Sequence, residues 1–300
     1  MKNVPNFFTL LNLVFGCIAI IFILQQNVLL LPLDSEGNLL RTPQQLENTS
    51  EKIWLASLFI GLAAIVDFLD GFVARFFKAE SAMGKQLDSL ADLVSFGVAP
   101  AMIIYQFLRL SFAQQSGGLD ASLIWLLPAM ILPCAAACRL AKFNLDNSQF
   151  FSFKGLPVPA VGLFVASLPL IYWNVNEQWV INLLLNKWFL YGLTLLLSYL
   201  MVSNIPLMSL KFKDFSLKNN IPKYLLVVIS IASIFIFTWM SVPVIILAYI
   251  ILSFIFKNNL HKYLLIVISI ASIFIFTWMS VPVMILAYVL LSLLFKNKSA

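Results

Sequence analysis

Four aspartates lie close together in the first third of the chain, in two groups joined by a short linker. The first group reads Asp67-x-x-Asp70-Gly71-x-x-Ala74-Arg75, and the second reads Gly84-x-x-x-Asp88-x-x-x-Asp92. On a helix, spacings of three and four residues place side chains on one face. Two helices with these faces opposed would therefore gather four carboxylates in one small volume.

Carboxylates at that separation cannot all stay ionised unless a cation lies between them. Oxygen ligands favour hard divalent ions, so the pattern predicts Mg2+ or Mn2+ bound by the four aspartates, with two ions expected. The small residues Gly71, Ala74 and Gly84 leave space beside the metals for a bulky group, and the planar guanidinium of Arg75 suits a phosphate. The pattern therefore predicts a metal-bound diphosphate.

A diphosphate that links a nucleotide to a lipid is electrophilic at the phosphorus on the lipid side. Bound metals would neutralise its oxygens and stabilise the charge of the departing nucleotide. An attacking alcohol must lose its proton, and a carboxylate at the edge of the cluster can accept it. The chemistry expected of such a site is transfer of a phosphate-linked lipid group to an alcohol.

The composition places this site in a membrane protein. The 300 residues are 61% hydrophobic and 11% charged, with a mean hydropathy of +0.95, which is far too apolar for a soluble domain. The chain has one histidine, His261, in a polar joint near its end, so histidine-based catalysis is not expected. We therefore predict an all-α protein that crosses the membrane several times.

Six apolar runs precede the tail, and each is expected to form a span. They cover residues 8–31, 53–77, 83–108, 123–140, 154–173 and 188–202. The first aspartate group ends the second run and the second group begins the third. Because the linker 78–82 is short, these two helices are expected to be antiparallel neighbours, as a shared site requires.

The tail is an internal repeat, in which residues 223–258 and 262–297 are nearly identical at an offset of 39 residues. Each copy has about 33 mostly apolar residues, which as one helix would be about 50 Å long against a membrane core of about 30 Å. A hairpin of two short spans fits better. The predicted organisation is a six-span catalytic domain (1–222), one hairpin (223–258) and a duplicated hairpin (259–300), about ten spans altogether.

Positive charge predicts the orientation, with the N-terminus and the aspartates on the cytoplasmic side. Only four of the 19 Lys and Arg residues then lie in outside segments, namely Arg41, Lys52, Arg109 and Lys187. The net charge of +6 belongs to this asymmetry and to contact with anionic lipids, so nucleic acid is not an expected partner.

The eight-position pattern resembles the signature of the CDP-alcohol phosphatidyltransferases, and every defining position is filled. The resemblance implies a six-helix core in the bacterial inner membrane, a homodimer, and CDP-diacylglycerol as the lipid substrate. It implies Asp92 as the catalytic base and Asp67, Asp70 and Asp88 as metal ligands, with Asp92 sharing that role. The implied CDP-binding residues are Asp67, Gly71, Ala74, Arg75 and Gly84.

Within the family, the stretch 87–100 resembles the branch that uses L-serine and releases phosphatidylserine and CMP. Relatives that use glycerol 3-phosphate usually have proline in place of Ser89 and lysine in place of Leu93. The runs 139–144 and 155–159 match the same branch. There Arg139 and Lys142 are candidates to contact the serine carboxylate or a lipid phosphate, or else form a generic cytoplasmic anchor.

Two departures and two alternatives accompany this interpretation. Lys142 stands where arginine is frequent in the family, and the second tail hairpin has no counterpart. The same chemistry could act on glycerol 3-phosphate or inositol. Acids within a membrane could also mark a cation or proton transporter, although these acids lie at the cytoplasmic ends of their spans and none follows further across. Metal-dependent transfer of labelled serine would separate the classes.

Overall fold

The computed structural model describes residues 4–25, 53–76, 81–114, 122–145, 153–174, 177–207 and 217–257. Its α-helices are α1 (Val4–Leu24), α3 (Ile53–Phe76), α4 (Ala82–Asp92), α5 (Ala99–Ala113), α6 (Ile131–Leu145), α7 (Val158–Asn174), α8 (Gln178–Leu184), α9 (Lys187–Val202), α10 (Leu217–Phe237) and α11 (Ser241–Lys257). Between them lie a π-helix, η1 (Leu93–Val98), the 3-10 helices η3 (Leu123–Trp125), η4 (Leu127–Met130) and η5 (Thr238–Met240), and the two-residue strands β1 (Phe153–Lys154) and β2 (Pro206–Leu207).

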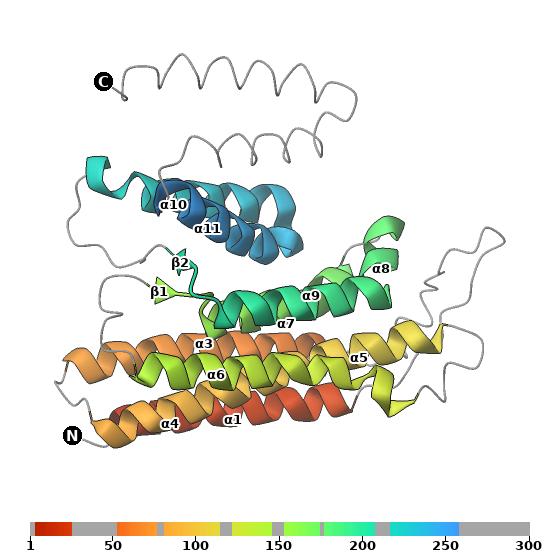
Figure 1. The fold of residues 1–300 in the computed structure, drawn as a ribbon, viewed down its shortest axis with the longest axis horizontal. Coiled ribbons are helices and arrows are strands. Elements are labelled where there is room, and N and C mark those ends of the chain that lie inside the picture. The colour runs from red at the N-terminus through yellow and green to blue at the C-terminus, as the bar shows by residue number, and fades with distance from the viewer. Residues whose placement is uncertain are drawn as a thin grey trace, which may run out of the picture.

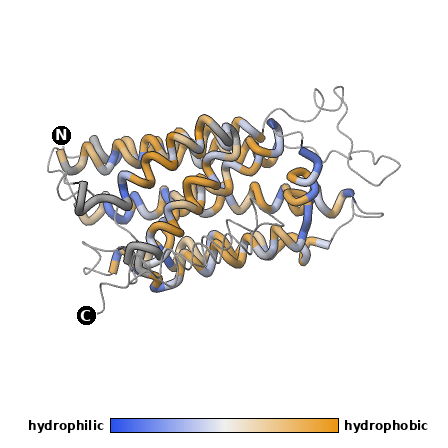
Figure 2. Tube along the Cα trace, turned by 90° about the horizontal axis from the view of Figure 1, so that it is seen from above, coloured by the Kyte–Doolittle hydropathy of each residue, from blue (hydrophilic) through white to orange (hydrophobic). Residues whose placement is uncertain are grey.

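The helices form layers, shown in Figure 1. The first layer holds α1, α3, α6 and the long rod of α4 and α5, and α7 and α9 lie against it. The α10–α11 pair lies on the outer side of α7 and α9, where α11 contacts α7 and β2. Hydrophobic residues occupy most of the length of the helices, and hydrophilic residues gather toward their ends (Figure 2).

Within the part of the chain that the structure describes, three helices are long and apolar enough to cross a membrane, which makes this a helical membrane protein. They are Asn6–Leu24, Ile53–Ala74 and Ala82–Ala113. A fourth span results if the bent pair Gln178–Leu184 and Lys187–Val202, which meet at 64°, is counted as one. Shorter apolar helices cover Val158–Asn174, Lys223–Phe235 and Ser241–Ser253. The arrangement of about ten spans stays a prediction, and the second tail copy lies outside the described residues.

The rod of α4 and α5 contains a π-helical segment directly after the second aspartate group. Pro100 has no backbone N–H, so it cannot donate to the carbonyl one turn before it. Ala99 instead donates to the carbonyl of Val94, five residues back. The sequence predicts one span over 83–108 and gives no sign of this segment, and π segments inside α-helices are frequent at functional sites.

Gly16 brings α1 into direct contact with this π segment. A Cβ atom added at Gly16 would lie 2.8 Å from the Cα atom of Ser95, a separation that real Cβ atoms do not show. The Ser95 hydroxyl donates to the carbonyl of Asn12 at 3.0 Å. The absence of a side chain at Gly16 therefore sets the depth and register of α1 against the rod.

The expected fourth and sixth spans differ in detail from the observed helices. Instead of one helix over 123–140, the chain makes the 3-10 turns η3 and η4 and then α6. Pro128 is the second residue of η4, and Pro133 falls in the first turn of α6, where its missing N–H would have no helical partner. The sixth span is preceded by the short helix α8 at a sharp bend.

The joint before α7 packs against the end of α9. Gly155 has φ +76°, and a Cβ atom there would lie 2.7 Å from the carbonyl oxygen of Ser203. The backbone N–H groups of Gly155 and Leu156 donate to the carbonyls of Ile205 and Leu200. Only glycine combines this backbone conformation with so close an approach, so the motif at 155–159 has a structural cause.

The first tail copy contains two helices. The sequence predicts a turn at 238–243, and the structure has η5 at Thr238–Met240 between α10 and α11. Helix α10 begins at Leu217, before the repeated sequence starts at Lys223.

Candidate active site

Three of the four predicted carboxylates meet between α3 and α4. One carboxylate oxygen from each of Asp67, Asp88 and Asp92 lies within 4.8 Å of the other two. Asp92 is 7% exposed, and the other two are half-buried. The two helices thus oppose their acidic faces, as the spacing of the aspartates predicts.

Asp70 lies one turn further along α3 and has a different partner. It is buried, and its carboxylate accepts a hydrogen bond from the hydroxyl of Thr9 on α1. It is not part of the close group of three. The structure therefore places Asp70 beside the cluster, and its role as a metal ligand stays a prediction.

Helix α1 supplies two polar side chains that the sequence analysis assigned no role. Thr9 contacts Asp70, and the amide nitrogen of Asn12 donates to Asp92 at 3.2 Å. Both side chains are buried, and Asn12 Oδ1 has no hydrogen-bond partner among the described residues. Their spacing of three residues in an apolar run was a usable signal, because buried polar groups in a membrane need partners.

The N-terminal turn of α4 meets the start of α1. Ser81 caps α4 by accepting from the N–H of Gly84 at 2.9 Å. A Cβ atom at Gly84 would lie 3.2 Å from the Asn6 side-chain oxygen and 3.0 Å from the Ser81 hydroxyl. Gly84 thus lies where these two helices approach, on the same face of α4 as Asp88.

The other predicted CDP-binding residues follow Asp67 on the last turns of α3. Gly71 is exposed and Ala74 is half-buried, so the described parts of the chain leave this face of α3 open at Gly71 and only partly cover it at Ala74. Arg75 lies on the same helix, and its side chain is outside the described set.

Helix α6 packs along α4 and the π segment that follows it. The Asn144 amide donates to the Ser89 hydroxyl at 2.8 Å, and Lys85 Nζ donates to the Asn144 carbonyl at 3.2 Å. Further along, Gly97 and Ala136 face each other, since a Cβ atom at Gly97 would lie 3.1 Å from the Ala136 Cβ. These two pairs fix the antiparallel register of α6 against the rod.

The predicted anion contacts Arg139 and Lys142 have different surroundings. Arg139 is 5% exposed, and its guanidinium lies 5.4 Å from the centre of the Phe143 ring. Its Nε has no hydrogen-bond partner in the part of the chain that the structure describes. Lys142 is exposed and donates to the Val202 carbonyl at 3.3 Å. The register above puts Arg139 nearly level with Val94, two residues past Asp92.

The acidic cluster fits a divalent cation. All of its donors are carboxylate oxygens, which hard ions such as Mg2+ and Mn2+ prefer. The amide oxygen of the neighbouring Asn12 has no hydrogen-bond partner among the described residues, so it is a further available acceptor in the same buried region. Three converging carboxylates and an unpaired acceptor are what a cation would satisfy.

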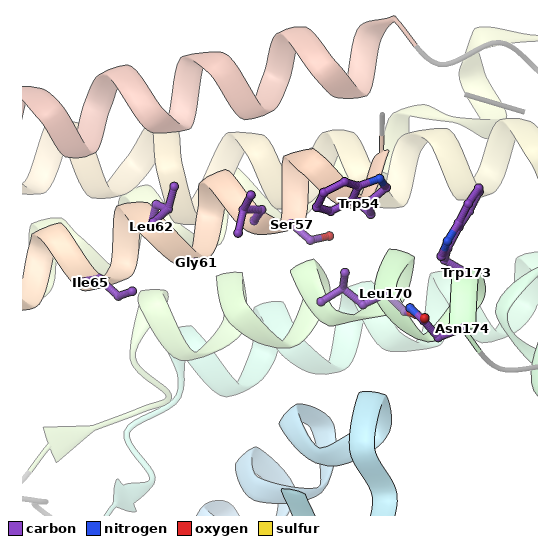
Figure 3. Close-up of a pocket in the computed structure, with 9 residues that line it drawn as sticks. Trp54, Ser57, Gly61, Leu62, Ile65, Leu170, Trp173 and Asn174 are labelled. Carbon is purple, nitrogen blue, oxygen red and sulfur yellow. The ribbon is translucent and has the colours of Figure 1, made fainter. Parts of the chain in front are cut away.

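An apolar groove runs between α3 and α7 (Figure 3). Its volume is about 590 Å³, and it is lined by Trp54, Ser57, Leu58, Gly61, Leu62, Ile65, Leu170, Trp173 and Asn174. The lining on α3 ends at Ile65, two residues before Asp67. At Gly61 an added Cβ would meet no atom of the described residues within 4 Å, so the groove is open there.

Comparison with known sequences identifies the class of this fold and site. The family model described as CDP-alcohol phosphatidyltransferase matches residues 2–203 of this chain. The chain therefore belongs to the CDP-alcohol phosphatidyltransferase family, which confirms the resemblance seen in the aspartate pattern. The α10–α11 hairpin and the second tail copy lie beyond the matched residues.

Several curated relatives carry the name CDP-diacylglycerol–serine O-phosphatidyltransferase. The chain is 38% identical to that of Bacillus subtilis over 117 residues, or 39% of this chain and 61% of the relative. It is 33% identical to that of Helicobacter pylori strain J99 over 191 residues, covering 63% and 73%. It is 34% identical to that of Methanocaldococcus jannaschii over 146 residues, covering 49% and 60%. These alignments span between 60% and 73% of the relatives' own lengths.

Proposed function

We propose that this protein transfers the phosphatidyl group of CDP-diacylglycerol to the hydroxyl of L-serine, giving phosphatidylserine and CMP in a metal-dependent reaction. The observation that carries the proposal is the convergence of Asp67, Asp88 and Asp92 within 4.8 Å. The names of the relatives support serine as the acceptor, as does the family-like stretch at 87–100.

Two Mg2+ or Mn2+ ions would be held by Asp67, Asp70, Asp88 and Asp92. Bound there, they would neutralise the diphosphate and stabilise the charge on departing CMP. The hydroxyl of Thr9 fixes the carboxylate of Asp70, as outer partners of metal ligands commonly do.

The nucleotide lies along the open end of α3. Gly71 and Ala74 leave room beside Asp67 for the CDP group, and Arg75 supplies positive charge for a phosphate. Gly84 keeps the facing turn of α4 free of a side chain.

Asp92 accepts the proton of the attacking serine hydroxyl. It is the most deeply placed member of the close group, and Asn12 donates to one of its oxygens, which holds the carboxylate in one orientation. A base must lie within hydrogen-bond reach of the proton that it takes. Asn12 therefore acts as a positioning residue for the base.

Arg139 binds the carboxylate of serine. Its buried guanidinium belongs to the neighbouring helix α6, at a level two residues past Asp92 along the rod. An arginine fork suits a carboxylate, and it would also suit the phosphate of glycerol 3-phosphate, the alternative acceptor. Lys142, whose amine is directed to the end of α9, has an outer and weaker part in this role.

One acyl chain of CDP-diacylglycerol occupies the α3–α7 groove. The groove extends along α3 from Ile65 to Trp54, eleven residues back, which corresponds to about 16 Å of helix. That length is about half the hydrocarbon thickness of a bilayer and matches one acyl chain. Trp54 and Trp173 close its far end, where aromatic residues commonly lie near the membrane surface.

The acidic ends of α3 and α4 face the cytoplasm, in the inner membrane of a bacterium. The bias of Lys and Arg toward the segments on that side supports this orientation. Assembly as a homodimer is part of the same proposal and rests on the family resemblance.

The test offers three acceptors to the purified chain in detergent micelles that contain CDP-diacylglycerol and Mn2+. Labelled serine, glycerol 3-phosphate and inositol are supplied separately, and the lipid product and CMP are measured. We expect serine to give phosphatidylserine and equimolar CMP. If glycerol 3-phosphate or inositol reacts faster than serine, that alcohol is the substrate in place of serine. If none of the three alcohols accepts the phosphatidyl group, the result favours a transporter.

A further inference from the structure

The buried amide of Asn12 has only part of its hydrogen bonding satisfied. The side chain lies on α1 at 0% exposure, and its nitrogen donates to the carboxylate of Asp92 at 3.2 Å. Its oxygen, Oδ1, has no hydrogen-bond partner among the described residues. An amide oxygen can accept two hydrogen bonds, and burying it unpaired destabilises the protein. The site therefore lacks a hydrogen-bond donor at this point.

Contacts on both sides of Asn12 hold it in place. Its backbone carbonyl accepts from the hydroxyl of Ser95 at 3.0 Å, and one turn later Gly16 allows α1 to approach the π segment closely. One turn earlier, Thr9 donates to Asp70. The unpaired oxygen is thus part of a well-packed helix, and buried groups of this kind in a native protein commonly have a functional or ligand-binding cause.

The position of Oδ1 suits a group next to the attacking hydroxyl. The oxygen and nitrogen of an amide share one carbon atom, so Oδ1 lies directly beside the nitrogen that donates to Asp92. An alcohol that gives its proton to Asp92 must bring its neighbouring atoms to the same place. In a 2-amino alcohol the amino and hydroxyl groups are on adjacent carbons, and a staggered rotamer places them side by side.

An ammonium group matches what Oδ1 lacks. It has N–H donors and no acceptor, so it can pair with the amide oxygen without leaving a lone pair unmatched. Its positive charge is also favourable beside the carboxylates of Asp67, Asp88 and Asp92. Alcohols without an amino group, such as glycerol 3-phosphate and inositol, would leave Oδ1 unpaired.

We propose that Asn12 Oδ1 accepts a hydrogen bond from the ammonium group of the acceptor, so that Asn12 selects a 2-amino alcohol over alcohols that lack the amino group. This inference rests on the proposed function, because it concerns the acceptor of that reaction. A site that hydrogen-bonds one group of its substrate rejects analogues that lack that group, since its own buried partner is then left unpaired.

The experiment compares three acceptors in mixed micelles that contain CDP-diacylglycerol and saturating Mn2+. L-Serine carries all three functional groups, 3-hydroxypropionate lacks only the amino group, and ethanolamine lacks only the carboxylate. The lipid product and CMP give kcat/KM for each acceptor. We expect the wild type to prefer serine over 3-hydroxypropionate by about 10- to 100-fold, the usual effect of one hydrogen bond to a charged group.

Two substitutions separate the amide oxygen from the amide nitrogen. Asn12→Leu removes both atoms at similar size, so transfer to all three acceptors should fall, because Asp92 loses its donor. The preference for serine over 3-hydroxypropionate should fall as well, by most of its wild-type value, whereas the preference for serine over ethanolamine should change less than about twofold. Asn12→Asp keeps an oxygen acceptor, so it should retain the preference for serine although kcat falls.

Ser198→Ala is the matched control. The hydroxyl of Ser198 on α9 is likewise buried and without a partner among the described residues. Its removal should leave kcat/KM unchanged for all three acceptors. An effect on acceptor preference at Asn12 is then a property of that position, and not of every unpaired polar group.

Four outcomes would overturn the inference. They are equal use of serine and 3-hydroxypropionate by the wild type, equal losses for all three acceptors in Asn12→Leu, loss of the serine preference in Asn12→Asp, and a higher Mn2+ requirement with unchanged preference, which would place Oδ1 on the metal. If Asn12→Leu is inactive with every acceptor, the preference of Asn12→Asp decides. A wild-type chain that transfers nothing to serine would instead refute the proposed function.

Discussion

Replacing Thr9 with valine removes one hydroxyl from the outer side of the acidic site and leaves the shape of the side chain almost unchanged. That hydroxyl donates to the carboxylate of Asp70, and both residues are buried. A hydrogen bond to a charged group contributes about 1.5–3 kcal/mol, which corresponds to roughly 10- to 150-fold in an equilibrium constant. Because we propose Asp70 as a metal ligand, this loss should appear in metal affinity.

The assay titrates Mn2+ against the rate of serine transfer by the chelator-treated protein. For Thr9→Val we expect the Mn2+ concentration at half-maximal rate to rise by about 10- to 100-fold, the usual effect of losing an outer partner of a metal ligand. Thr194→Val is the matched control, since the buried Thr194 hydroxyl donates only to the Leu190 carbonyl on α9. It should leave the metal dependence unchanged. An unaltered Mn2+ titration in Thr9→Val would refute the role given to Asp70.

Three other changes test separate parts of the proposal. Asp92→Asn should still bind CDP-diacylglycerol but lose serine transfer by about 100-fold or more, as expected for a general base; transfer at the wild-type rate would remove Asp92 from the mechanism. Gly61→Phe should fill the groove and slow transfer from long-chain CDP-diacylglycerol more than from short-chain analogues, whereas Gly192→Phe, at an equally open position on α9, should not alter chain-length preference. Deleting residues 260–300 should leave serine transfer within a few-fold of the full chain per mole of protein, and an inactive but well-expressed truncation would show that the second tail copy is needed. Reporters fused at residues 258 and 300 should both be cytoplasmic, and an external reporter at either position would contradict the hairpin arrangement of the tail.

Local periodicity was enough to predict the acidic site. The spacings of Asp67, Asp88 and Asp92 define helix faces, and a linker of a few residues leaves two antiparallel helices little choice of partner. The composition likewise predicted a helical membrane protein. These features depend on residues near one another in the chain.

The contacts from α1 depend on longer-range packing. Thr9 and Asn12 could be noticed as polar residues in an apolar run, but their partners lie 61 and 80 residues away. Which aspartate each one meets follows from the depth of α1, and Gly16 sets that depth by its approach to Ser95. Spacing alone cannot give the register between two helices.

The π segment, the groove and the position of the first tail hairpin were also beyond the sequence pattern. The π segment reflects one missing N–H at Pro100 within an otherwise regular helix. The groove exists only after α7 packs beside α3, and the first tail hairpin takes its place only when α11 packs against α7 and β2. Each needs the tertiary arrangement.

The most direct test of the central claim measures Mn2+ bound to the purified protein by electron paramagnetic resonance, alongside serine transfer by the same samples. We predict bound Mn2+ and transfer in the wild type, loss of both on exhaustive chelation, and restoration of both when Mn2+ is added back. Asp88→Asn should fold but neither retain the bound ion at the same concentration nor transfer serine. Full serine transfer after exhaustive chelation, or unchanged Mn2+ binding in Asp88→Asn, would contradict the assignment of this carboxylate cluster as the catalytic metal site.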